Sequence, residues 1–84
     1  MRKKNLIKDG MEQKIYKFEN GYGASVVRNS ISYGHELGLW EVAVIKFSQD
    51  DNWSLCYSTP ITDDVIGYLN EQAVDNLLQQ IEAL

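Results

Sequence analysis

Cysteine, histidine and proline each occur only once in this chain of 84 residues. The single cysteine, Cys56, excludes an internal disulfide and indicates a reducing compartment such as the cytoplasm. It has no basic neighbour in sequence that would activate the thiol, so we expect a packed structural residue. The one histidine, His35, lies in a glycine-flanked turn without a second ligand or a nucleophile nearby, and we expect an exposed turn residue. No apolar run approaches the roughly 20 residues of a transmembrane helix, so we expect no membrane partner.

Basic residues are missing from almost half of the chain. No lysine or arginine follows Lys46, whereas the segment 47–84 contains seven carboxylates and therefore has a net charge of −7. A surface of one sign repels nucleic acid, attracts a basic protein, or imitates a phosphate backbone. We therefore expect a protein partner, with a basic one as one version, and no direct nucleic-acid binding. The candidate partner-binding carboxylates are Asp50, Asp51, Asp63, Asp64, Glu71, Asp75 and Glu82.

A second interpretation gives these carboxylates no binding role. Aspartate doublets between strands are common turn residues, and many proteins are acidic for solubility alone. Neither Asp50-Asp51 nor Asp63-Asp64 shows the ligand spacing of a calcium loop or the facing pair of a hydrolase. The Gly21-Tyr22-Gly23 segment lacks the third glycine and the following helix of a phosphate-binding loop. The sequence therefore predicts no enzyme, no cofactor and no metal site.

The first ten residues have the opposite charge, with four basic residues against one aspartate. They begin like a secretory signal peptide, but only Leu6 and Ile7 follow where an apolar region of about 7–15 residues is required. We interpret residues 1–10 as a flexible basic leader or an upstream extension. Residues 11–84 then form one α+β domain, with four basic and eleven acidic residues.

Strand signals occur in the segments 13–19, 24–29, 39–47 and 53–58, and a short edge strand is predicted at 65–68. Whether the second of these continues to residue 33 stays open. Asn20-Gly21 is a strong hairpin signal because both residues tolerate a positive φ angle. Segment 39–47 is apolar on both faces, which is typical of a central strand. Trp53, Leu55 and Tyr57 share one side of their strand, and Trp40, Trp53 and Tyr57 belong either to the core or to the uncovered sheet face.

A helix is predicted after Asn70, a good N-cap, with Glu71 in the first turn where the helix dipole favours an anion. Its apolar stripe consists of Val74, Leu77, Leu78, Ile81 and Leu84. The predicted fold is therefore an antiparallel meander of four to five strands with one C-terminal amphipathic helix packed on one face. One sheet face then stays uncovered. The sequence leaves open which one it is, and we expect Trp40, Val42 and Val44 to form an exposed patch for a partner or a second copy.

Three segments, 16–27 (YKFENGYGASVV), 39–47 (LWEVAVIKF) and 59–69 (TPITDDVIGYL), resemble small uncharacterised proteins encoded by bacteriophages and prophages. The resemblance implies a bacterial cytoplasm as the location. It carries no activity and no functional residues to transfer, and residues 1–10 lie outside it.

We therefore expect a non-enzymatic accessory protein that acts by binding another protein. An acidic inhibitor of a host DNA-handling protein is a more specific version of this expectation. The alternative is a self-associating structural, virion or assembly component. Size in solution separates the two, since a homo-oligomer would bury the face assigned to a foreign partner.

Overall fold

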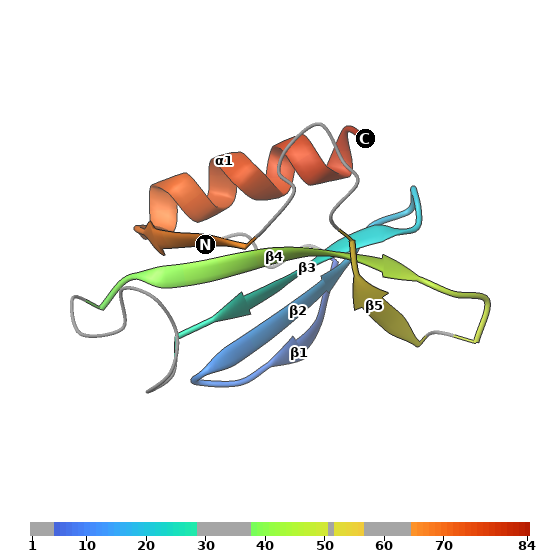
Figure 1. Ribbon diagram of the computed structural model, residues 1–84, viewed down its shortest axis with the longest axis horizontal. Helices are drawn as coiled ribbons and strands as arrows, with labels where there is room; N and C mark the ends of the chain where they lie inside the picture. Colours follow the sequence, from blue (N-terminus) through green and yellow to red (C-terminus); the bar gives the residue numbers. More distant parts are fainter. Residues whose placement is uncertain (1–4, 29–37, 51, 57–64) are drawn as a thin grey trace.

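A six-stranded antiparallel sheet carries a single C-terminal helix on one face in the computed structural model, which describes residues 5–28, 38–50, 52–56 and 65–84 (Figure 1). The helix α1 runs along the sheet above β3 and β4. The elements are β1 (Leu6–Asp9), β2 (Gln13–Lys17), β3 (Tyr22–Val27), β4 (Trp40–Phe47), β5 (Trp53–Leu55), β6 (Ile66–Leu69) and α1 (Glu71–Glu82).

The strands follow one another across the sheet in the order β1-β2-β3-β4-β5. Strand β6 pairs with β4 as well, so β5 and β6 occupy successive stretches of the same β4 edge. This arrangement confirms the predicted α+β class, the antiparallel meander and the C-terminal helix. Strand β4 lies centrally, as its two apolar faces indicate.

The prediction of a flexible leader over residues 1–10 is wrong for residues 6–9, which form the edge strand β1. Leu6 pairs with Tyr16, Lys8 with Ile15, and a bulge separates the two pairs. The strand was missed because its alternation is short and mostly charged. An edge strand needs only a partner for its backbone groups and one apolar anchor, which Leu6 supplies by packing against the core.

The hairpin and the start of the helix form as predicted. Gly21 has a φ angle of 86° in the turn between β2 and β3, a conformation that costs glycine little. At the helix start, the side-chain oxygen of Asn70 accepts a hydrogen bond of 2.8 Å from the N–H of Ala73. This N-cap satisfies one of the donors that the first helical turn leaves without a partner.

The core lies between α1 and one face of the sheet. Val74, Leu77, Leu78 and Ile81 of the helix are buried there, as the 3.6-residue period predicts. The sheet side of this core consists of Tyr16, Phe18, Ala24, Val26, Trp40, Val42 and Val44.

The expectation that Trp40, Val42 and Val44 form an exposed patch is therefore wrong. Their exposed fractions are 4%, 1% and 2%, because α1 covers this face of β4 rather than the other. Strand register explains the choice. Val44 lies opposite Ala24 and Val42 opposite Val26, so the apolar face of β4 continues on β3.

The face without α1 is less uniform. Strand register sets Ile45 opposite Gly23 and Ala43 opposite Ser25, so glycine and serine interrupt the apolar surface. Ile15 and Ile45 are nevertheless buried on this face, at 3% and 0% exposure. We call this surface the helix-free face.

Candidate functional site

The acidic residues predicted to bind a partner fall into two described groups. Asp50 lies in the turn between β4 and β5, while Glu71, Asp75 and Glu82 lie on α1. Asp51, Asp63 and Asp64 lie outside the described residues, as does His35.

The carboxylate of Asp50 is used inside its own turn. It accepts hydrogen bonds from the Ser48 hydroxyl and, at 2.8 Å, from the side-chain amide of Asn52. The Ser48 hydroxyl, followed by the backbone N–H groups of Asp50 and Asn52, lowers the pKa of Asp50 below its ordinary value of 3.8. Asp50 is therefore a turn residue that holds its negative charge at neutral pH, which favours the structural interpretation of this doublet.

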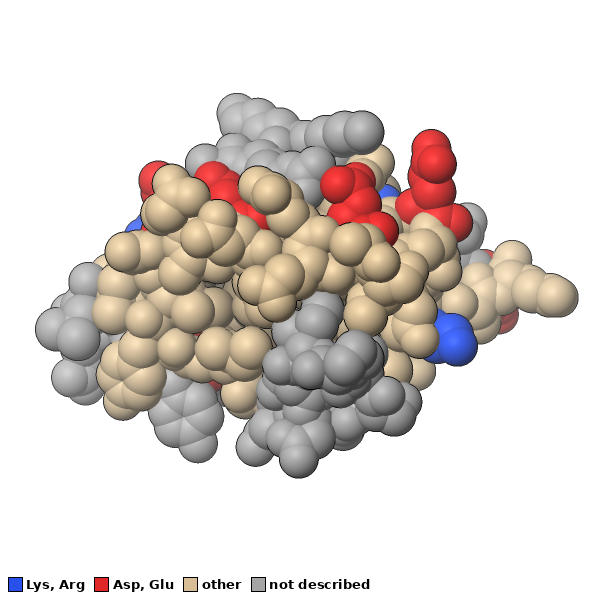
Figure 2. All heavy atoms as spheres, turned by 90° about the horizontal axis from the view of Figure 1, so that it is seen from above, with Lys and Arg blue, Asp and Glu red and all other residues tan. Residues whose placement is uncertain are grey.

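The helix carboxylates lie along one side of α1. Residues 71, 75 and 82 are spaced by four and seven positions, which places them within about 40° of one another around the helix axis. Figure 2 shows carboxylates in a row along one long side of the helix-bearing surface. The helix itself contains no lysine or arginine. We call Glu71, Asp75 and Glu82 the acidic stripe.

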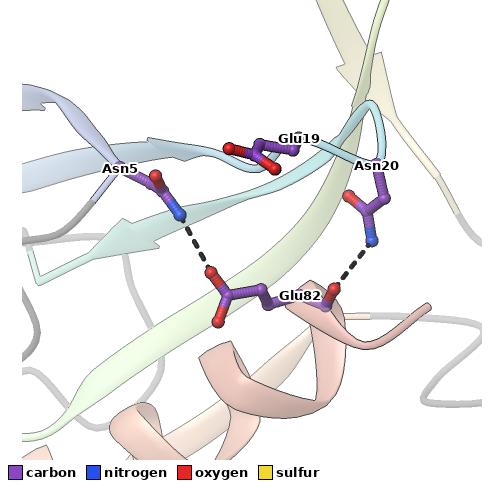
Figure 3. A pocket seen from close by; sticks show the side chains of 4 residues that line it. All are labelled: Asn5, Glu19, Asn20 and Glu82. Carbon is purple, nitrogen blue, oxygen red and sulfur yellow. Dashed lines mark hydrogen bonds between the residues drawn. The ribbon is translucent and has the colours of Figure 1, made fainter.

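The stripe ends in a hollow of about 500 Å³ at the C-terminal end of α1. It is lined by Asn5, Glu19, Asn20 and Glu82, and Figure 3 shows their arrangement. The side-chain amide of Asn5 donates a hydrogen bond of 3.0 Å to a carboxylate oxygen of Glu82. This contact ties the beginning of the described chain to the end of the helix.

Asn20 holds the helix end from the hairpin turn. Its side-chain nitrogen donates to the carbonyl oxygens of Ile81, Glu82 and Leu84 at 3.0, 3.2 and 3.1 Å. Its side-chain oxygen accepts the N–H of Tyr22 at 3.0 Å. The two hydrogens of one amide are thus shared among three carbonyls at and just beyond the end of α1, of which that of Ile81 also accepts the N–H of Leu84 at 3.2 Å. We call this set of contacts the Asn20 clamp.

An exposed apolar strip lies on β5, at the other end of the strand order from β1. Trp53 and Leu55 are 41% and 48% exposed, and they lie opposite Phe47 and Ile45 of β4. Their side chains therefore project on the helix-free face beside Phe47, which is half-buried. We call Phe47, Trp53 and Leu55 the β5 strip. The prediction that Trp53 lies in the core or on the uncovered face is confirmed for the uncovered face.

The backbone of β5 adds hydrogen-bonding groups to this strip. The N–H of Cys56 donates to the carbonyl of Val44 at 2.8 Å. Because inward and outward residues alternate in an antiparallel strand, the N–H and C=O groups of Trp53 and Leu55 point away from β4. Strand β5 is the last in the described sheet order, so these groups lie at its edge.

Three further predictions concern bound groups and the thiol. Among the described residues, no cluster of three or more His, Cys, Asp or Glu side chains could hold a metal ion. In that same part of the chain, no helix has the length and apolar character needed to cross a bilayer. Cys56 is half-buried and packs against the core, as expected for a structural thiol.

Trp40 is not part of an exposed patch, and its side chain brings one polar atom into the core. Its indole Nε1 has no hydrogen-bond partner among the described residues. The Arg28 guanidinium lies 4.4 Å from the centre of a Trp40 ring and donates to the carbonyl of Gly38 at 3.2 Å. This cation–π contact fixes the indole plane without satisfying its N–H group.

Searches against protein-family models, curated proteins and solved structures found no match for this chain. The resemblance to phage-encoded proteins therefore stays a prediction.

Sequence reasoning missed the Asn20 clamp and the exposed part of the β5 strip. The turn signal at Asn20-Gly21 was recognised, but nothing local indicates that the amide reaches residues more than 60 positions away. For the β5 strip a signal existed. The segment 52–56 has no charged residue, although it follows an aspartate doublet, and an uncharged edge strand is unusual in an acidic protein.

Proposed function

We propose that this protein is a non-enzymatic accessory protein that binds another protein through the β5 strip. The observation that carries the proposal is the exposure of Trp53 and Leu55 on β5, the last strand in the described sheet order, whose backbone groups at these residues point away from β4. A segment of a partner in extended conformation can add to such an edge. Backbone hydrogen bonds then supply affinity, and the alternating side chains supply specificity.

The chemistry of the strip restricts its partner. Residues 52–56 are Asn-Trp-Ser-Leu-Cys, so the partner strand meets no charge along the edge itself. The nearest described charges along the chain and across the ladder are Asp50, in the turn before β5, and Lys46, opposite Ser54 on β4, one of each sign. An apolar, uncharged strand of the partner therefore fits best. Because the described edge is only three residues long, we expect a small and weak interface unless further contacts add to it.

The acidic stripe supports a second candidate function, the inhibition of a basic, DNA-handling protein. Three carboxylates on one side of a helix without a basic residue favour a basic groove as partner. The axial separations are about 6 Å between positions 71 and 75 and about 10 Å between 75 and 82. This uneven spacing fits general electrostatic attraction better than imitation of a phosphate backbone with its regular repeat.

Self-association remains the alternative to a foreign partner. The edge of β5 could pair with the same edge of a second copy, which would give an isologous dimer. The location that we propose is the bacterial cytoplasm. It is supported by the resemblance to phage and prophage proteins and by the lone cysteine.

The proposal is tested with matched variants of the full chain in affinity capture from bacterial lysate. The strip variant is Trp53→Ser/Leu55→Ser, and its control is Tyr68→Ser, which removes an aromatic side chain of 64% exposure from β6. The stripe variant is Glu71→Gln/Asp75→Asn. Each is measured at about 0.1 M and about 0.5 M salt, where screening of exposed charges differs severalfold.

We expect one protein to be captured at both salt concentrations and to be lost only in the strip variant. Loss in the stripe variant, with retention confined to low salt, would replace the β5 strip by the acidic stripe. Light scattering of the purified chain tests the alternative. A stable dimer that dissociates in the strip variant would assign the edge to a second copy.

A further inference from the structure

We propose that Asn20 is a modification site, at which spontaneous deamidation through a cyclic imide with Gly21 disables the Asn20 clamp. This inference is independent of the β5 strip and of the proposed function. It rests on the chemistry of an asparagine followed by glycine and on what the Asn20 amide holds in this fold.

Reactivity depends first on the residue that follows the asparagine. The backbone nitrogen of that residue attacks the side-chain carbonyl carbon, and a side chain on the attacking residue hinders the approach. Of the six asparagines, only Asn20 precedes glycine. The other five precede Leu6, Ser30, Trp53, Glu71 and Leu77. The chain thus contains one asparagine with an unhindered neighbour and five internal controls.

The local geometry keeps the reacting groups together and open to water. The side-chain oxygen of Asn20 accepts the N–H of Tyr22. This hydrogen bond folds the Asn20 side chain back over the Gly21 peptide group and polarises the side-chain carbonyl of Asn20. The N–H of Gly21 has a long hydrogen bond of 3.2 Å to the carbonyl of Phe18. Apart from Gly21 and its two chain neighbours, no atom of the described residues lies within 4 Å of the position where a Gly21 side chain would begin, and Asn20 itself is exposed.

The reaction balances without an oxidant or a further reactant except water. A bond forms between the Gly21 nitrogen and the side-chain carbon of Asn20, and the bond from that carbon to the amide nitrogen breaks. The amide nitrogen leaves as ammonia with the proton of the Gly21 nitrogen. Water then opens the ring at either carbonyl, and the product is aspartate or isoaspartate at position 20.

The consequence follows from the clamp. The Asn20 nitrogen donates to three carbonyls at the helix end, and a carboxylate has no proton to donate to them. The new charge also faces the negative pole of the helix and the hollow that Glu19 and Glu82 line. The last turn of α1 then loses its attachment to the hairpin between β2 and β3. In the isoaspartate product the main chain of this hairpin is also longer by one carbon atom.

The three carbonyls also control the rate. Hydrogen bonds to these carbonyls hold the amide nitrogen and slow its departure, so the reaction is fastest in molecules in which the last helical turn has opened. Such local openings are frequent at helix ends. The reaction is irreversible, so the clamp is lost progressively as the protein ages.

Mass spectrometry of the ageing protein tests both halves of the proposal. Trypsin cleaves after Lys17 and Arg28, so Asn20 is the only asparagine in the peptide 18–28. The full chain is incubated at mildly alkaline pH and sampled over days. We expect this peptide alone to gain about one mass unit, because an amide becomes an acid. Asn20→Gln serves as the chemical control, since its longer side chain forms the ring far more slowly.

Hydrogen exchange of residues 80–84 then reports the clamp. We expect roughly tenfold faster exchange in the aged protein and in Asn20→Asp than in fresh protein, the effect of losing about one net hydrogen bond. Equal mass gain in the peptides that contain the other asparagines would overturn the assignment of the site. Mass gain in peptide 18–28 with unchanged exchange at residues 80–84 would overturn the release of the helix end.

Discussion

The two faces of the sheet differ in what covers them, although β4 is apolar on both. On one face, Trp40, Val42 and Val44 pack beneath α1 and are almost fully buried. On the other, Phe47 of the same strand lies beside Trp53 and Leu55, which are about half exposed. The difference shows that the face covered by the helix is determined by the apolar residues that three neighbouring strands present together. A single strand does not decide it.

The pattern across the strands is contiguous only on the covered face. Register places Tyr16 beside Ala24 and Ala24 beside Val44, with no polar residue between them. On the helix-free face, the neighbouring rung places Ile15 beside Ser25 and Ser25 beside Ala43. Ser25 is buried there at 7% exposure without α1, and its hydroxyl receives a hydrogen bond of 3.2 Å from the Gln13 amide, so a polar group interrupts the apolar residues of this face.

The largest expected effect compares the same truncation on each face. Leu78 is fully buried beneath the covered face, whereas Leu55 is 48% exposed on the helix-free face. We expect Leu78→Ala to lower the free energy of unfolding by about 2–5 kcal/mol because it leaves a cavity. Leu55→Ala should change it by about 0.5 kcal/mol or less. Urea denaturation with unchanged m-values measures both. Equal losses would show that the helix-free face is covered in solution.

This comparison also explains what could be predicted from sequence. Hairpin, N-cap and amphipathic helix have local causes, in Asn20-Gly21, in Asn70 and in the apolar spacing after Val74. The covered face could not be predicted from the alternation in β4, since both of its faces are apolar. Which face is covered depends on how β4 is aligned with β3 and β2. Short strands take this alignment from the strands with which they pair.

The candidate site was predictable to a smaller extent. The acidic stripe follows from helical spacing, because residues 71, 75 and 82 fall on one side of any regular helix. The β5 strip depends on β5 being an edge, and that is set by strand order. The Asn20 clamp depends on where α1 ends relative to a hairpin formed about 60 residues earlier. Such contacts have no signature in a single sequence.

The second prediction concerns Gly23→Ala, a substitution that adds one carbon atom on the helix-free face. A side chain at Gly23 would begin 2.0 Å from the carbonyl oxygen of Tyr16 and 2.7 Å from the ring of Phe47. Both contacts are too short, so we expect Gly23→Ala to destabilise the fold by about 1–3 kcal/mol in urea denaturation.

A double variant separates the two contacts. If the Phe47 ring were the only obstacle, adding Gly23→Ala to Phe47→Ala would cost nothing further. We expect most of the cost to remain, because the carbonyl oxygen of Tyr16 belongs to the backbone and cannot turn away.

The third prediction weakens α1, the element that makes the two faces different, at each of its ends. Asn70→Ala removes the N-cap and should cost about 1 kcal/mol. Asn20→Ala removes donors from three carbonyls at the other end, and a similar loss of about 1 kcal/mol is expected. Thermal unfolding measures both. The helix end is held by something other than the Asn20 clamp if Asn20→Ala leaves the melting temperature unchanged.

The smallest expected effect concerns the turn that begins β5. The pKa of Asp50 is lowered in the folded protein, chiefly by the hydrogen bond from Ser48, so the ionised carboxylate stabilises this turn. That contribution is fully present above the ordinary pKa of 3.8 and is lost as the pH falls through the lower folded value. The stability advantage of the natural chain over Asp50→Asn should therefore shrink on acidification.

The two tryptophans allow this loss to be assigned to one face. Trp40 is buried on the covered face and Trp53 is exposed on the helix-free face, so Trp40→Phe leaves fluorescence from β5 alone. We expect the Trp53 emission in that background to shift on acidification before the helical circular dichroism changes, and to lose this early shift when Asp50→Asn is added. Simultaneous loss of both signals would mean that the helix-free face and the covered face unfold as one unit even at this turn.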